Sequence, residues 1–268
     1  MSVLLLSVIF LLIGFFSGVL IGLLGIGGGL VFVPVLYYLL PLIIETPANL
    51  AYFTLGTSLF AGALATSNSA ILHIRKENFS KKPAILISAG AVITAFVAPF
   101  FVVKVKSEII ELIFASVMIL VALRMIFENN KKENHKLSKP LSDPFFILVG
   151  LLTGILSAFT GLGGGIVYVP SLIYLFLINV KIAIGTSSII TAATMISSAV
   201  AYILQGTGTN SYMSSIGFII PEAGVPLAIG AIFGTFLGVK IVMKSSTEFI
   251  KKSFAVILIA AVLKILLT

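Results

Sequence analysis

Two stretches with the same glycine-rich pattern are the part of this sequence best suited to binding chemistry. The first reads Gly-Ile-Gly-Gly-Gly-Leu-Val-Phe-Val-Pro over residues 25–34, and the second reads Gly-Leu-Gly-Gly-Gly-Ile-Val-Tyr-Val-Pro over residues 161–170. A helix that restarts after such a break has unpaired N–H groups and a positive dipole end, which favour a bound anion. The pattern therefore predicts an anion site made of the backbone amides of Gly27, Gly28, Gly29, Gly163, Gly164 and Gly165.

The segments that follow the glycines, residues 30–40 and 166–178, are too short to cross a bilayer. About 12 helical residues extend only ~18 Å, against a hydrocarbon layer of about 30 Å. Short, glycine-interrupted segments at matching places in two inverted halves are typical of the central site of a transporter. The alternative is that the glycines only let membrane helices pack closely.

Hydroxyl side chains recur in a second duplicated motif. Gly56-Thr57-Ser58 matches Gly185-Thr186-Ser187 at a distance of 129 residues. We predict that Thr57, Ser58, Thr186 and Ser187 donate to the bound anion, with Asn68 and Thr191 as further candidates on the same segments. The alternative is that these hydroxyls bond to carbonyls of their own helices.

Two titratable residues are candidates for gating or coupling. His73 stands beside Arg75 where a span meets a basic loop, a place suited to sensing pH or to drawing anions towards the membrane. Glu222, between Pro221 and Pro226, is the one carboxylate placed to enter the membrane and couple transport to protons. The alternative for both residues is an ordinary position at the membrane interface.

The composition is that of a polytopic, all-α membrane protein. Of the 268 residues, 59% are hydrophobic and 10% are charged, and the mean hydropathy is +1.21. The alternating ten-residue strands of a membrane β-barrel are absent from the pattern. With no cysteine and two histidines, the sequence predicts neither a metal site nor a cofactor. The net charge of +8 lies in short loops, so we attribute it to membrane topology and not to nucleic-acid binding.

The chain reads as two repeats of five hydrophobic segments each. Residues 1–127 form the first transmembrane repeat, residues 128–143 a polar cytoplasmic linker, and residues 144–268 the second repeat. The ten predicted segments lie at residues 2–24, 29–41, 51–73, 83–103, 107–127, 145–162, 165–178, 182–204, 217–240 and 248–267.

An odd number of segments in each half predicts that the two halves have inverted topology. The positive-inside rule supports this, because placing Arg75, Lys76, Lys81 and Lys82 in the cytoplasm also places most other basic residues there. The corresponding loop of the second half, residues 205–215, carries no charge, as expected on the opposite side. We therefore expect a multi-pass protein of the cell membrane with both termini extracytoplasmic.

Together the doubled glycine motif with its Val-x-Val-Pro ending, the Gly-Thr-Ser motif and the pair His73 and Arg75 resemble the TauE/SafE family of sulfite-exporter-like permeases. The resemblance covers almost the whole chain. It implies transport of small sulfur-containing or organic anions such as sulfite, thiosulfate or sulfonates. The second half departs from the pattern, because Tyr202 stands at the histidine position and the loop of residues 206–215 has no basic residue.

These observations predict that the protein exports a small anion by alternating access around the two glycine breaks. The competing interpretations are an intramembrane hydrolase or lipid-modifying enzyme and an accessory membrane subunit. The enzyme interpretation lacks a supporting motif, since the sequence has no His-Glu-x-x-His and no Gly-x-Ser-x-Gly. The predicted partners are the anion and the lipid bilayer, and the sequence predicts no oligomeric state.

Overall fold

The computed structural model is helical, apart from one bridge between Ile216 and Ile219, over the residues that it describes. These are residues 3–43, 49–106, 142–206 and 214–246, together with 108–110, 112–113, 116 and 248–249. The longer helices are α1 Val3–Leu24, α3 Leu50–Arg75, α4 Lys81–Val97, α7 Asp143–Thr160, α9 Val180–Gln205 and α10 Pro221–Lys244. The short ones are α2 Gly29–Leu39, η1 Leu40–Leu42, α5 Pro99–Val102 and α8 Gly165–Tyr174.

Within these ranges, 6 helices are long and apolar enough to cross a membrane, with α4 and α5 counted as one span. This confirms the all-α membrane class. The predicted segments at residues 29–41 and 165–178 correspond to the short helices α2 and α8. The predicted segments at residues 107–127 and 248–267, and the linker, lie almost entirely outside the described residues.

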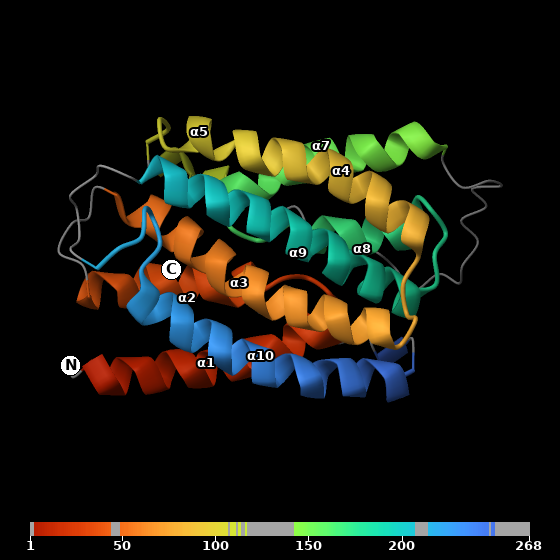
Figure 1. Ribbon diagram of the computed structural model, residues 1–268, viewed down its shortest axis with the longest axis horizontal. Coiled ribbons are helices and arrows are strands. Elements are labelled where there is room, and N and C mark those ends of the chain that lie inside the picture. The colour runs from red at the N-terminus through yellow and green to blue at the C-terminus, as the bar shows by residue number, and fades with distance from the viewer. Residues whose placement is uncertain are drawn as a thin grey trace.

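The helices pack in pairs around a central pair (Figure 1). Helix α1 packs against α10, α4 packs against α7, and α3 packs against α9 between them. The apolar windows of α3 and α9 are 72% and 67% buried, against 39% in α1, α4 and α7. Helices α3 and α9 therefore form the interior, and each carries one short helix, α2 on α3 and α8 on α9.

Glycines let the outer pairs approach closely. Along α1, Gly14, Gly18 and Gly22 face the backbone of α10, and Gly230, Gly234 and Gly238 of α10 face the backbone of α1 in return. The pair α4 and α7 repeats this contact through Gly90, Gly150 and Gly154. Lipid supplies no hydrophobic force between helices, so close backbone approach at small residues is what stabilises such pairs.

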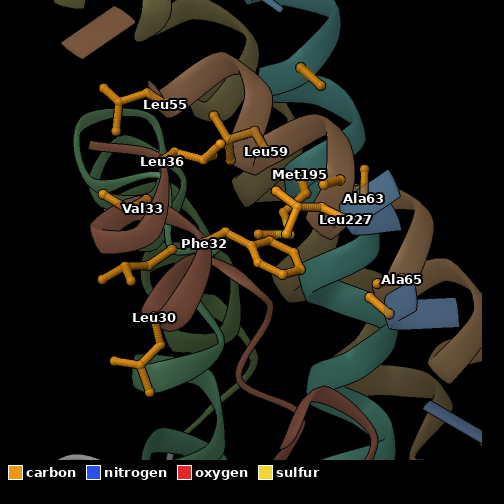
Figure 2. Close-up of a cluster of buried hydrophobic side chains, with 14 of the residues drawn as sticks. Leu30, Phe32, Val33, Leu36, Leu55, Leu59, Ala63, Ala65, Met195 and Leu227 are labelled. Carbon is orange, nitrogen blue, oxygen red and sulfur yellow. The ribbon is translucent and has the colours of Figure 1, made fainter. Parts of the chain in front are cut away.

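Short helix α2 closes the core on one side (Figure 2). Its buried Leu30, Val33 and Leu36 recur at helical spacing and belong to one cluster with Leu55 and Leu59 of α3. The same cluster includes Met195 of α9 and Leu227 of α10. Residues of α2, α3, α9 and α10 thus belong to one apolar cluster.

Charged side chains gather at the end of the bundle where α3 ends and α4, α7 and α9 begin. We call this the charged end. Lys82 Nζ lies 2.7 Å from Asp143 Oδ1, and Lys181 Nζ donates to the Met243 carbonyl over 3.1 Å. Helix α10 ends here too, at Lys244.

Candidate functional site

The two predicted breaks form loops whose backbones match at the first and third residues and differ at the fourth, where Gly28 has φ of −85° and Gly164 has φ of 78°. The first glycine loop, residues 25–28, joins α1 to α2, and the second glycine loop, residues 161–164, joins α7 to α8. Gly25 and Gly161 have φ of 66° and 67°, and Gly27 and Gly163 have φ of 77° and 76°. Only glycine adopts such angles readily, which explains its presence at these positions.

The two loops lie against each other in the interior. A β-carbon on Gly165 would lie 2.6 Å from the Gly25 oxygen, and one on Gly29 would lie 2.5 Å from Leu162 Cα. A β-carbon on Gly27 would lie 2.7 Å from the Leu162 oxygen. Backbone therefore contacts backbone, and the starts of α2 and α8 are brought together.

Unpaired backbone amides are concentrated at these helix starts. Hydrogen bonding within α2 begins with Val31 N and Phe32 N, which both donate to the Gly28 oxygen, and α8 repeats this at the Gly164 oxygen. Within the described part of the chain, the amides of residues 27–30 and 163–166 donate to no acceptor. All of these residues are buried. Since almost every buried N–H in proteins is paired, this concentration of donors is the property expected of an anion site.

The two predicted serines hold the loops from the opposite halves of the chain. Ser58 Oγ donates to the Gly161 oxygen over 3.1 Å, and Ser187 Oγ donates to the Gly25 oxygen over 2.7 Å. Both serines are fully buried, two turns inside α3 and α9. Because their protons are already donated, this conformation favours a role in positioning the loops over direct contact with an anion.

The two predicted threonines bind loops that precede other helices. Thr57 Oγ1 accepts from Ile220 N over 3.0 Å at the start of α10. Thr186 Oγ1 accepts from Ser80 N over 2.9 Å at the start of α4 and donates to the Ile182 oxygen of its own helix. The Gly-Thr-Ser motifs thus connect the centre of the bundle to two loops at its ends.

Of the two further candidates on these helices, Asn68 forms a side-chain hydrogen bond, whereas the hydroxyl of Thr191 forms none in the described structure. Asn68 Nδ2 donates to Thr235 Oγ1 over 2.6 Å and so ties α3 to α10. Thr191 is fully buried, and its hydroxyl has no partner in the described structure. Its methyl group would lie 3.1 Å from a β-carbon on Gly27, which places Thr191 beside the first glycine loop.

Sequence reasoning missed Met195, one helical turn after Thr191. A β-carbon on Gly62, and another on Gly163, would each lie 2.6 Å from Met195 Cε. The side chain is fully buried among the core residues of Figure 2. Its spacing of four residues from Thr191 was the available signal, because residues four apart share a helix face.

The charged end holds a buried contact that we call the polar dock, formed by His73, Asn78 and Lys181. Asn78 Nδ2 lies 2.9 Å from His73 Nδ1 and donates to the Lys181 oxygen over 2.9 Å. His73 is fully buried in the last turn of α3, whereas Arg75 is exposed. His73 therefore belongs to the contact between α3 and α9 at this end.

The opposite end has a corresponding contact, the aromatic dock, formed by Tyr52, Phe53, Tyr202 and Phe218. The Phe218 ring packs edge-on against Tyr52, Phe53 and Tyr202, with ring centroids 5.5, 5.4 and 6.5 Å apart. Tyr202 Oη donates to the Ala158 oxygen over 2.9 Å. Glu222 lies near this end, half-buried in the first turn of α10, and its Oε2 has no partner among the described residues.

A metal centre has no support in the described ranges, where no group of three or more His, Asp or Glu side chains could hold an ion. The unpaired groups at the glycine loops are N–H donors, which suit an anion.

Comparison with known proteins gives a consistent result. Residues 10–265 match the family described as Sulfite exporter TauE/SafE. A "Probable membrane transporter protein" of Haemophilus influenzae is 33% identical over 260 residues, covering 96% of this chain and 97% of the relative. Relatives described in the same words are 30% identical in Methanocaldococcus jannaschii, covering 92% of this chain and 91% of the relative, and 25% identical in Bacillus subtilis, covering 94% of each. No solved structure matches the chain.

Proposed function

The chain belongs to the TauE/SafE family, a family of membrane transporters and not of enzymes, and we propose that it exports a small anion bound between the two glycine loops. The proposed substrates are small sulfur-containing or organic anions such as sulfite, thiosulfate or a sulfonate. The family name supports a sulfur oxyanion, and the relatives support transport.

One observation carries this proposal: the two sets of buried, unpaired amides at residues 27–30 and 163–166. A hydrogen bond to a charged group contributes about 1.5–3 kcal/mol. Three or four such bonds reach the roughly 8 kcal/mol of micromolar binding, before the costs of association are subtracted. Thr191, whose methyl group lies beside the position of Gly27, has a buried hydroxyl without a partner among the described residues and is a further candidate donor.

The proposed architecture is two inverted repeats, residues 1–127 and 144–268, joined by the linker of residues 128–143. Its support is the way helix contacts recur. Under the offsets of the sequence repeat, α1 corresponds to α7 and α10 to α4, so the pairs α1–α10 and α4–α7 are equivalent contacts. The reciprocal serine bonds, Ser58 to Gly161 and Ser187 to Gly25, obey the same relation. Such repeats can rock against each other and expose one site to each side in turn.

We propose that the charged end faces the cytoplasm, which makes both termini extracytoplasmic. Lys76 is exposed at the charged end and Ser214 is exposed beside the start of α10. Single cysteines at these two positions in this cysteine-free chain should react with a membrane-impermeant maleimide from opposite sides of the membrane. Reaction from the same side would refute the orientation and the inversion together.

The test of function is anion flux into or out of vesicles that contain only this protein. Under a potassium–valinomycin potential we expect sulfite, thiosulfate or a sulfonate to move towards the positive side. Each elementary charge gains about 2.3 kcal/mol per 100 mV, which suffices for export without an ion gradient. Flux without partners would also exclude an accessory subunit.

Glu222 distinguishes this driving force from proton coupling. We expect Glu222→Gln to leave the flux unchanged, because the carboxylate lies at the start of α10 and not at the glycine loops. Flux that ignores the potential, follows an imposed pH gradient and disappears in Glu222→Gln would overturn the proposal and make Glu222 a coupling residue.

A further inference from the structure

One side chain occupies the space beside both glycine loops. Met195 reaches from α9 to three glycines of different elements: Gly27 of the first loop, Gly163 of the second loop and Gly62 of α3. A β-carbon on Gly163 would lie 2.6, 2.7 and 2.8 Å from Met195 Cε, Cγ and Sδ. Thr66 Oγ1 lies 3.9 Å from the sulfur. A β-carbon at Gly62 or Gly163 would collide with the thioether, whereas one at Gly27 would touch Met195 Cε at the ordinary contact distance of 3.4 Å.

One of the unpaired amides, that of Gly28, lies near this same space. A β-carbon on Gly62 would lie 2.6 Å from Met195 Cε and 3.7 Å from the amide nitrogen of Gly28. Thr191 lies one turn before Met195 on α9; its methyl group lies beside the position of Gly27, and its buried hydroxyl has no partner in the described structure. A thioether is a weak acceptor, so Met195 fills the space beside these donors without satisfying them.

We propose that Met195 is a displaceable plug of the anion site, and that its side chain sets the size of the anion that the site accepts. This proposal rests on the proposed function. The unbranched methionine side chain has three rotatable bonds and fills irregular gaps. It can therefore turn away when an oxyanion takes the amides, and the space it leaves limits how long a tail that oxyanion carries. Sulfite has no tail, whereas the two-carbon sulfonate sulfoacetate needs the space of the thioether.

The first half of the chain supports this assignment by contrast. Thr66 occupies on α3 the place that Met195 occupies on α9, since both follow the Gly-Thr-Ser glycine of their helix by ten residues. Thr66 donates to its own helix at the Gly62 oxygen over 2.7 Å and leaves the central space to Met195. Of the two equivalent positions, only that of Met195 therefore supplies a plug. Shortening the Met195 side chain should change this one space and no matching space in the first half.

The test compares sulfite and sulfoacetate transport by vesicles that contain wild-type protein, Met195→Ala, Met195→Thr or the control Met243→Ala. Met243 is a half-buried methionine near the end of α10, at the charged end. We expect both Met195 variants to raise the ratio of sulfoacetate to sulfite transport about tenfold, the effect of one or two methylene groups in a pocket. The control should keep the wild-type ratio. Met195→Thr introduces the residue found at the equivalent position and carries the test if Met195→Ala does not fold.

A ratio within about twofold of wild type in the folded Met195 variants would overturn the plug while leaving the proposed function intact. Wild-type vesicles that carry neither anion would instead overturn the proposed function, and the plug with it. A ratio that rises equally in Met243→Ala would show a general loosening of the bundle and would also overturn the plug.

Discussion

The polar dock and the aromatic dock occupy equivalent places at opposite ends of the bundle, yet they are built from different chemistry. In each dock, the amide of the loop residue donates to a carbonyl near the end of a central helix: Asn78 N to the His73 oxygen, and Phe218 N to the Tyr202 oxygen. The polar dock then adds hydrogen bonds of one asparagine side chain. The aromatic dock adds three ring contacts of one phenylalanine.

This difference suggests that the two ends open at different cost. When the polar dock separates, water can replace the partners of Asn78, so the net loss per hydrogen bond is about 0.5–1.5 kcal/mol. When the aromatic dock separates, apolar ring surface is exposed to water, at a free-energy cost of roughly 25 cal/mol per Å². We therefore expect the charged end to open more readily than the aromatic end.

The largest effect is predicted for Phe218→Ala. Phe218 is only 4% exposed and sits at the centre of the aromatic dock, so its loss leaves a cavity among Tyr52, Phe53 and Tyr202. The expected destabilisation is about 3–5 kcal/mol, measured by thermal or denaturant unfolding in detergent. A matched control is Phe233→Ala, because Phe233 is 63% exposed on α10 and faces outward. Equal losses of stability in Phe218→Ala and Phe233→Ala would show that the contacts of the aromatic dock contribute no extra stability.

A smaller effect is predicted for Asn78→Ala. The variant loses the bonds to His73 Nδ1 and the Lys181 oxygen, at a cost of about 1–3 kcal/mol. Hydrogen exchange of the amides around Ser80 should accelerate, because the loop is held less firmly on α9. Asn179→Ala is the control for the exchange measurement, since it removes the N-cap of α9 at a cost of about 0.5–2 kcal/mol but leaves the contacts of Asn78, so exchange around Ser80 should stay as in wild type. If Asn78→Ala lowered stability as much as Phe218→Ala does, the proposed difference between the two docks would be contradicted.

The class of fold was predictable from sequence because hydrophobic length alone decides whether a helix can span a membrane. The glycine loops were predictable as breaks, because the positive φ of Gly25, Gly27, Gly161 and Gly163 strongly favours glycine. The contact between the loops was also predictable, because the predicted site combines amides of both glycine motifs. The role of the serines was not predictable, because their acceptors, Gly161 and Gly25, lie more than a hundred residues away.

The roles of His73, Asn78 and Met195 could not be predicted from the sequence. His73 was predicted as a residue of a basic membrane edge, but tertiary packing buries it against Asn78, which carried no signal of its own. Met195 reads as an ordinary core methionine; its spacing from Thr191 places it on the same helix face, but the three surrounding glycines that define its position are found in the structure. Contacts between distant segments decide such roles, and a single sequence does not contain them.

The most direct test of the central claim uses Thr191, whose counterpart in the first half is Gly62. Because the buried hydroxyl of Thr191 has no partner in the described structure, Thr191→Val should leave stability unchanged or raise it by about 1 kcal/mol. If that hydroxyl and the neighbouring amides bind the anion, the same variant should weaken binding of thiosulfate about tenfold, measured as the anion-induced rise in Tm. Thr186→Val is the control, because its hydroxyl serves Ser80 N and the Ile182 oxygen and its loss should lower Tm without changing the affinity. Wild-type affinity in Thr191→Val, or a fall in its Tm without ligand, would contradict an anion site at the glycine loops.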